Sequence, residues 1–213
     1  MALHEDGAIL AYGEPLEQAS AAMVMLHGRG ATARDILSLA PLIAPTGATD
    51  RRIAFLAPQA ANNTWYPYPF TQPIPRNEPW LSSALARVGQ MVALVQEVGI
   101  PVERTYLLGF SQGACLALEY AARHAARYGG VFGLSGGLIG PDDTPRNYPG
   151  SMDAAPVFLG CSDVDFHIPK ERVLESADVF RRLGADVTAR LYPNMDHTVN
   201  DDEIEFVRQL LAA

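Results

Sequence analysis

The chain has 213 residues, of which 48% are hydrophobic and 19% are charged, and its formal net charge at pH 7 is −8. This composition is typical of a globular protein with a substantial core, and residues 1–213 are expected to form a single domain. Because the balance is acidic and no basic run could neutralise phosphates, the sequence argues against nucleic acid or an anionic membrane as a partner.

The N-terminal residues, the apolar segments and the cysteines indicate where in the cell the protein is expected. The first ten residues, MALHEDGAIL, lack the basic segment and apolar stretch of a secretory signal. No apolar run reaches the ~18 residues of a membrane-spanning helix, so no stable membrane insertion is expected. Cys115 and Cys161 are far apart in apolar segments and are expected to be buried free thiols. Together these features predict a cytoplasmic protein.

Short apolar segments alternate with longer amphipathic segments along the chain. The predicted strands are residues 21–28, 51–58, 104–110, 129–136, 155–162 and 186–193. The predicted helices are residues 31–43, with Thr32 as a cap, and then 80–99, 112–125, 170–185 and 201–213. Continuous apolar strands that alternate with helices are typical of a parallel sheet covered on both faces, so the sequence predicts an α/β architecture.

Ser111 is the first candidate for chemistry. It lies in Gly109-Phe-Ser-Gln-Gly113, directly between a predicted strand and a predicted helix. A strand that turns sharply into a helix brings the residues beside the serine against each other, which explains the two glycines. The alternative is a serine that caps a helix beside turn glycines. The strand–GxSxG–helix context favours the nucleophile.

A serine nucleophile needs a base and a carboxylate that orients the base. His197 follows the last predicted strand and precedes the last helix, so its loop could bring the imidazole over Ser111. Residues 159–169, LGCSDVDFHIP, follow the penultimate strand and offer Asp163 and Asp165. In an extended stretch both project to the same side, so the residues alone leave both open. The chain order Ser, Asp, His is that of α/β-hydrolases.

An oxyanion hole is predicted after the first of these strands. Residues 26–31, LHGRGA, form a glycine loop there, and the backbone N–H of Arg29, with that of Gln112, would bind the oxyanion. His27 is expected to have a structural role, in which its ring braces this loop. His4 lies in the N-terminal tail.

The segments LHGRGA, GFSQGA, DVDFHIP and MDHTV together resemble the phospholipase/carboxylesterase family of small α/β-hydrolases, which includes acyl-protein thioesterases. The resemblance covers the chain from about residue 22 to the C-terminus. It implies an α/β-hydrolase fold, with a mostly parallel central sheet flanked by helices and no large cap domain. It also implies hydrolysis of carboxylic esters without a cofactor.

The resemblance also assigns roles to residues of this chain. It makes Ser111 and His197 catalytic, and it places the oxyanion hole on Arg29 and Gln112. It selects Asp165 as the acid, because Asp165-Phe-His-Ile-Pro is similar to the family's D-x-x-V-P. Two departures stand out. Most of the family has leucine where this chain has Arg29, and NNTWYPYPF replaces the Trp-Phe-Asp motif of the acyl-thioesterase branch.

The pocket is expected to involve residues 59–79, a long segment rich in proline and aromatic rings that fits neither a helix nor a strand. Loops of that length in compact domains are usually functional or disordered, and the rings favour function. The candidate lining residues are Trp65, Tyr66 and Phe70 from this loop, with Leu138 and Met195 from elsewhere. A substrate pocket of this kind is mostly apolar with a few polar groups.

The sequence therefore predicts a serine carboxylesterase that acts on a small-molecule ester, with short to medium acyl chains, through an acyl-enzyme. An acyl thioesterase or lysophospholipase on the same site is the alternative within enzymes. A hydrolase-fold binding protein that has lost catalysis is the alternative from another class. DVDFH could in principle hold a divalent ion, but an acid loop with a neighbouring histidine is expected instead, so no metal and no cofactor are predicted. A homodimer is compatible with the sequence.

Overall fold

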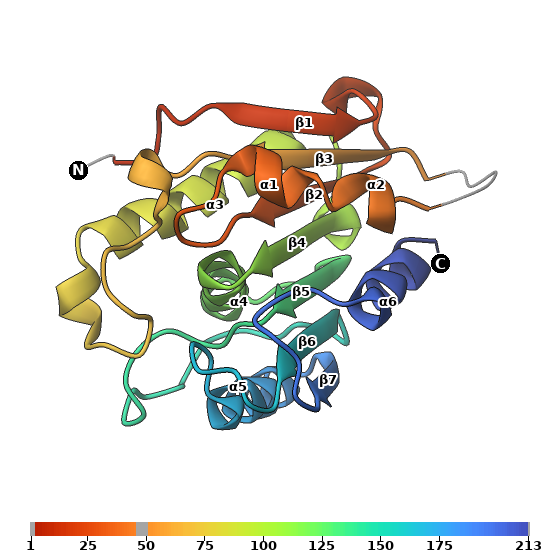
Figure 1. The fold of residues 1–213 in the computed structure, drawn as a ribbon. Helices are drawn as coiled ribbons and strands as arrows, with labels where there is room; N and C mark the ends of the chain where they lie inside the picture. Colours follow the sequence, from red (N-terminus) through yellow and green to blue (C-terminus); the bar gives the residue numbers. More distant parts are fainter. Residues whose placement is uncertain (1–2, 46–50, 213) are drawn as a thin grey trace.

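The computed structural model describes residues 3–45 and 51–212 (Figure 1). Within them lies a seven-stranded sheet in the order β1-β3-β2-β4-β5-β6-β7. Its strands are β1 (Ile9–Gly13), β2 (Ala21–Leu26), β3 (Ile53–Pro58), β4 (Thr105–Phe110), β5 (Gly130–Leu134), β6 (Pro156–Ser162) and β7 (Asp186–Tyr192). All neighbours pair in parallel except β1, which is antiparallel to β3. The mostly parallel sheet with helices confirms the predicted α/β-hydrolase fold.

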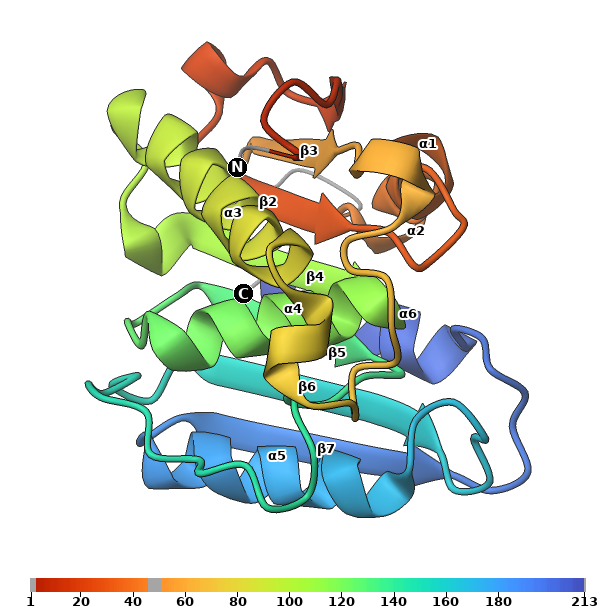
Figure 2. The same cartoon turned by 90° about the vertical axis from the view of Figure 1, so that its left-hand side faces the viewer.

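Helices cover both faces of this sheet. They are α1 (Ala33–Leu37), α2 (Ala40–Ile43), α3 (Trp80–Glu97), α4 (Gln112–Arg123), α5 (Lys170–Arg182) and α6 (Asp201–Ala212). On one face α3, α4 and α5 pack in a row (Figure 2), and on the other face lie α1, α2 and α6. Alternate residues of β2 enter the two cores, Val24 on the first face and Met23 on the second. This explains why the strand is apolar throughout.

Three local features differ from the sequence prediction or refine it. Strand β1 was not predicted, because it is short, mostly exposed and at the edge of the sheet. The predicted helix 31–43 is two short helices, α1 and α2, and Thr32 caps α1 in a capping box with Asp35. Residues 59–79 form an ordered loop with 3-10 turns at Ala61–Asn63 and Ile74–Asn77. Ala213, the last residue of the predicted helix, lies outside the described residues.

The carboxyl ends of the parallel strands meet at one edge of the sheet. Leu26 at the end of β2 pairs with Gly109 of β4, and Ser162 at the end of β6 pairs with Tyr192 of β7. The loops that follow these strands therefore converge, as open α/β sheets require for a ligand site. In the described ranges no helix is long and apolar enough to cross a membrane.

Candidate active site

Ser111 stands on a strained turn between β4 and α4. Its φ of 54° and ψ of −118° form a conformation that residues other than glycine rarely adopt. A Cβ at Gly109 would lie 2.2 Å from the carbonyl oxygen of Gly113, and one at Gly113 would lie 2.0 Å from that of Leu26. Both flanking positions therefore admit only glycine, as the pentapeptide predicted.

A continuous line of hydrogen bonds runs from Ser111 to Asp165. The Ser111 hydroxyl lies 2.8 Å from Nε2 of His197, and Nδ1 of that ring lies 2.6 Å from Oδ2 of Asp165. The side chain of His197 is 17% exposed, whereas that of Asp165 is fully buried. A carboxylate can only accept, so Nδ1 carries the proton and Nε2 is free to accept from the serine.

The acid loop holds Asp165 in its ionised form. Its Oδ1 accepts from the N–H groups of His167 and Ile168, at 2.8 and 3.0 Å. Burial raises the pKa of the Asp165 carboxyl, but the hydrogen bonds from His197 and these two N–H groups outweigh burial, and the net pKa lies below its ordinary value. The buried thiol of Cys161 also faces Oδ2, at 3.7 Å.

Asp163 has a different partner, although it lies only two residues away. Its Oδ1 accepts from the N–H of Asn194 at 2.9 Å, and its own N–H donates to the carbonyl of Tyr192. Asp163 therefore joins the acid loop to the loop that carries His197. In the described ranges no group of three His, Cys, Asp or Glu side chains is arranged to hold a metal ion.

Two backbone donors beside Ser111 are unpaired. Within the described residues neither the N–H of Arg29 nor that of Gln112 has a hydrogen-bond partner. Gln112 is the first residue of α4, where an N–H has no partner inside the helix. Both residues line the cleft that contains Ser111. These donors are available to an oxygen that carries negative charge.

His27 braces the loop of Arg29, as predicted. The backbone N–H of Ala60 donates to Nε2 of His27, so the neutral ring carries its proton on Nδ1, which donates to the carbonyl of Gly28 at 2.8 Å. Burial lowers the pKa of His27, which keeps the ring neutral. His4, which the sequence placed in a tail, is buried and accepts from the N–H of Ala61.

The side chains of Arg29 and Gln112 hold the loop of residues 59–79, which we call the aromatic loop. Gln112 accepts from the N–H of Trp65 and donates to the carbonyl of Tyr66. The guanidinium of Arg29 donates to the carbonyls of Pro67 and Tyr68. Each residue thus presents its backbone N–H to the cleft and fixes the cleft wall with its side chain. Nothing in the sequence analysis indicated this second role.

The cleft has a volume of about 560 Å³. It is lined by Gly28, Arg29, Ala31, Tyr66, Pro67, Pro69, Phe70, Phe110, Ser111, Gln112, Cys115, His167, Ile168 and His197. Tyr66 and Phe70 were among the predicted lining residues. Phe110, Cys115, His167 and Ile168 were not, although each lies beside a residue of the quoted motifs.

Trp65, Leu138 and Met195 are not on the cleft wall, and these three predictions are corrected. Trp65 is fully buried: its ring contacts the rings of His4 and His27, and its Nε1–H donates to the carbonyl of His27. Leu138 is fully buried, and its N–H and carbonyl bond to α5. Met195 contacts the side-chain amide of Asn200 through its sulfur.

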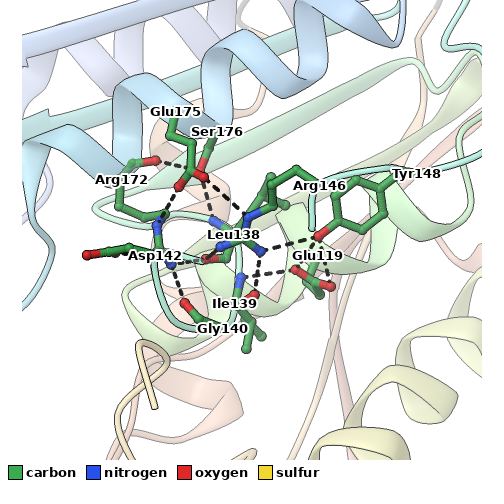
Figure 3. Close-up of polar contacts among 10 residues, drawn as sticks. All are labelled: Glu119, Leu138, Ile139, Gly140, Asp142, Arg146, Tyr148, Arg172, Glu175 and Ser176. Carbon is green, nitrogen blue, oxygen red and sulfur yellow. Dashed lines mark hydrogen bonds and ion pairs between the residues drawn. The ribbon is translucent and has the colours of Figure 1, made fainter. Parts of the chain in front are cut away.

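A polar cluster around Arg172 (Figure 3) contacts the cleft wall at Phe70 through Gly140 and Arg172. The N–H of Gly140 donates to the carbonyl of Phe70 at 2.8 Å. The guanidinium of Arg172, which is almost fully buried, donates to the carbonyls of Leu138 and Gly140 at 2.8 and 2.6 Å. Its Cζ also lies 5.7 Å from the centre of the Phe70 ring. Arg172 thus fixes both the loop and the ring.

Known proteins are similar to this chain in fold and, in part, in sequence. The crystal structure of a phospholipase/carboxylesterase from Dyadobacter fermentans matches this chain with a TM-score of 0.91, over 99% of this chain and 98% of that one. The two sequences are 44% identical. The crystal structure of Zea mays acyl-protein thioesterase 2 is 17% identical, with a TM-score of 0.68, over 96% and 97% of the two chains, which is a likeness of fold alone.

Among curated proteins, acyl-protein thioesterase 1 of Gibberella zeae is 32% identical over 122 residues, which are 53% of this chain and 49% of the relative. The chain thus spans about half the length of the curated relatives that it matches in this way. A family model described as phospholipase/carboxylesterase matches residues 9–213. Because that match covers nearly the whole sequence, the chain belongs to the phospholipase/carboxylesterase family.

Proposed function

We propose that the chain is a serine carboxylesterase that hydrolyses carboxylic esters with short to medium acyl groups through an acyl-enzyme. The observation that carries the proposal is the line of hydrogen bonds from Asp165 through His197 to Ser111. It ends at a hydroxyl on the wall of a cleft, beside two unpaired backbone donors. Nucleophile, base, orienting carboxylate and oxyanion donors are the set that acyl transfer requires.

In the acylation step the Ser111 oxygen bonds to the ester carbonyl carbon while its proton passes to Nε2 of His197. The carbonyl oxygen becomes an oxyanion, which the N–H groups of Arg29 and Gln112 stabilise. Asp165 stabilises the imidazolium and keeps its ring in position. The bond to the alcohol oxygen then breaks, and His197 returns its proton to that oxygen as the alcohol leaves.

Deacylation repeats these steps with water. His197 takes a proton from water, whose oxygen bonds to the acyl carbon, and the same two N–H groups stabilise the second oxyanion. The bond to the Ser111 oxygen breaks, His197 returns the proton to that oxygen, and the acid leaves. The sum is one ester and one water converted to one acid and one alcohol.

An acyl thioesterase is the second candidate. The observation that favours it is the 32% identity with a relative named acyl-protein thioesterase 1. The same residues would serve, because a thiolate leaves more readily than an alkoxide.

The test is turnover of nitrophenyl esters from acetate to palmitate, together with labelling by a fluorophosphonate. Wild-type protein is expected to hydrolyse the shorter esters and to bind one fluorophosphonate per chain, and Ser111→Ala to do neither. Circular dichroism shows whether each protein is folded. A folded wild-type protein that neither turns over any ester nor takes the label would refute the proposed function, and so would a labelled, active Ser111→Ala.

A further inference from the structure

The cleft carries positive charge in an acidic protein. The whole chain has a formal charge of −8, yet none of the residues that line the cleft, all of them in the described ranges, is Asp or Glu. Asp165 lies behind His197 with its side chain fully buried. Arg29 is the cationic side chain among the described residues that line the wall. A cleft with low-dielectric walls concentrates such a field at the point where a ligand binds.

Among the described residues, the guanidinium of Arg29 is held by neutral groups only. Its Nη1 donates to Oγ1 of Thr64 at 3.3 Å and to the carbonyl of Pro67 at 2.7 Å, and its Nη2 donates to the carbonyl of Tyr68 at 2.9 Å. Its Cζ lies 5.9 Å from the centre of the Tyr66 ring, which lines the cleft. In the described part of the chain Arg29 forms no ion pair. Its positive charge is therefore uncompensated.

In the described part of the chain these bonds leave two N–H donors of the guanidinium without a partner. A guanidinium has five N–H donors, and the three bonds above use three of them. The Nε–H and one Nη2–H remain, on a planar group that the loop holds still. Arginine donors held in this way match the two oxygens of a carboxylate or a phosphate.

The strand order determines which part of an ester would reach Arg29. Arg29 follows β2 and the aromatic loop follows β3, whereas the loops of Asp165 and His197 follow β6 and β7, on the other side of β4 and Ser111. Because His197 must give its proton to the leaving oxygen, the alcohol lies on its side. The acyl group then extends toward Arg29 and Tyr66.

We propose that the preferred substrates, under the proposed esterase function, carry an anionic oxygen group, a carboxylate or a phosphate, on the acyl portion, and that the side chain of Arg29 binds it. The substrate class is thus the half-ester of a diacid. Arg29 is then a residue that determines specificity through its side chain, apart from the contribution of its backbone N–H to the oxyanion hole.

The test compares matched methyl esters that differ only at the far end of the acyl chain. Monomethyl adipate ends in a carboxylate, methyl hexanoate ends in a methyl group, and a third ester of the same length ends in a phosphonate. Wild-type kcat/KM is expected to be higher for an anionic ester and to fall with added salt, with no such fall for the neutral one. Arg29→Gln is expected to lower the anionic-to-neutral ratio roughly tenfold, the factor for one charge-assisted hydrogen bond at a partly exposed site. Arg29→Lys keeps the charge and is expected to restore part of the ratio.

Arg76→Gln is the matched control. Arg76 lies in the same aromatic loop, over the ring of Tyr68, and is not among the residues that line the cleft in the described ranges. The Arg76→Gln substitution removes the same charge and is expected to leave the anionic-to-neutral ratio of kcat/KM unchanged. An equal loss of both activities in Arg29→Gln, or an equal change of the ratio in Arg76→Gln, would overturn the proposal. So would a preference for anions only on the alcohol, measured with acetoxyacetate against propyl acetate.

Binding to Ser111→Ala separates this proposal from the proposed function. Calorimetry with monomethyl adipate and methyl hexanoate needs no turnover, and the anionic ester is expected to bind roughly tenfold more tightly unless Arg29 is also replaced. Equal binding of the two esters would refute the anion site even if the wild-type protein is an active esterase. Tighter binding of the anion with no ester turnover in the wild type would refute the esterase function alone.

Discussion

His27 fixes the orientation of the peptide unit between Gly28 and Arg29, because its Nδ1–H donates to the Gly28 carbonyl at 2.8 Å. A trans peptide is planar, and its carbonyl and N–H point in opposite directions. The carbonyl points at the imidazole, so the Arg29 N–H points away from it. A buried ring outside the cleft therefore controls the direction of a donor inside it.

Replacing His27 by Phe keeps a ring in place but removes its hydrogen bonds with Gly28, Ala60 and Gln59. We expect kcat for a short ester to fall roughly 10²-fold with little change in KM, the effect of losing one oxyanion donor. His4→Phe is the control, since His4 also contacts the Trp65 ring but bonds Ala61 and Trp65 rather than Gly28. Steady-state kinetics and melting temperature on both variants test this. Equal losses of kcat in the two would contradict a specific role for His27.

The strained turn at Ser111 predicts a difference between two inactive variants. Glycine adopts a φ near 54° without steric cost, whereas alanine does not. Ser111→Gly is therefore expected to be more stable toward urea than Ser111→Ala, by about 1 kcal/mol, the lower end of the cost of such strain. The entropy that glycine gains in the unfolded state works against this. A Ser111→Gly protein that is clearly the less stable of the two would show that the turn stores little strain.

Asp165→Asn and Asp163→Ala are expected to fail in different ways. Asp165→Asn keeps the shape but removes the charge that orients His197, so kcat should fall by roughly 10³ to 10⁴. Asp163→Ala leaves the N–H of Asn194 without its acceptor, so it should lower the melting temperature with a much smaller effect on kcat. Kinetics and thermal unfolding of both variants distinguish these outcomes. A well-folded but inactive Asp163→Ala would reverse the assignment of the acid.

The cluster in Figure 3 predicts an effect on acyl preference from a residue outside the cleft. Arg172→Lys should loosen Phe70 and shift the ratio of kcat/KM for octanoate and acetate esters toward the longer chain. Arg146→Lys is the control, because Arg146 bonds Ile139 and Leu138 in the same cluster and has no contact with Phe70 in the described ranges. Both should lower the melting temperature, since each disturbs buried charges. If the two substitutions shift the acyl-chain preference equally, Arg172 has no specific role in positioning Phe70.

The burial of the Glu203 carboxyl leads us to expect that the stability of the protein depends on pH. Burial raises the pKa of its carboxyl to about 7, and its Oε1 has no hydrogen-bond partner in the described ranges. Because the folded pKa lies above the unfolded value of 4.5, its contribution is fully present below that value and is lost as the pH rises through 7. The free energy of unfolding of Glu203→Gln, relative to that of the wild type, should therefore rise by up to about 3 kcal/mol between about pH 4.5 and pH 8.5. Urea unfolding at both pH values tests this, and a difference that does not change with pH would refute it.

The sequence predicted those parts of the site whose geometry follows from local pattern and sheet topology. Gly109 and Gly113 indicate a steric constraint, so the turn at Ser111 could be predicted from the sequence. Strand ends that share an edge brought His197 and the acid loop to Ser111. Asp163 and Asp165 could not be separated by their spacing, because the choice depends on hydrogen bonds to Asn194 and His197, more than thirty residues away in each case.

The aromatic loop shows why the rest could not be predicted. Composition indicates a functional loop, but the direction of each ring depends on partners that are distant in the chain. Trp65 turns inward, where its ring contacts those of His4 and His27, and nothing in the N-terminal sequence marks His4 as a core residue. Strand β1 was missed because five mostly exposed residues carry too little pattern.

The way in which the aromatic loop is anchored has a consequence for directed evolution. Except at Thr64, the bonds from Arg29 and Gln112 reach main-chain atoms of the loop, namely the N–H of Trp65 and the carbonyls of Tyr66, Pro67 and Tyr68. Every amino acid supplies a carbonyl, so the anchors do not depend on which side chains the loop carries. A library randomised at Tyr66 and Phe70 would alter the shape and polarity of the cleft while the loop keeps its path. Substrate range can therefore diversify here without disturbing the residues that would perform the chemistry.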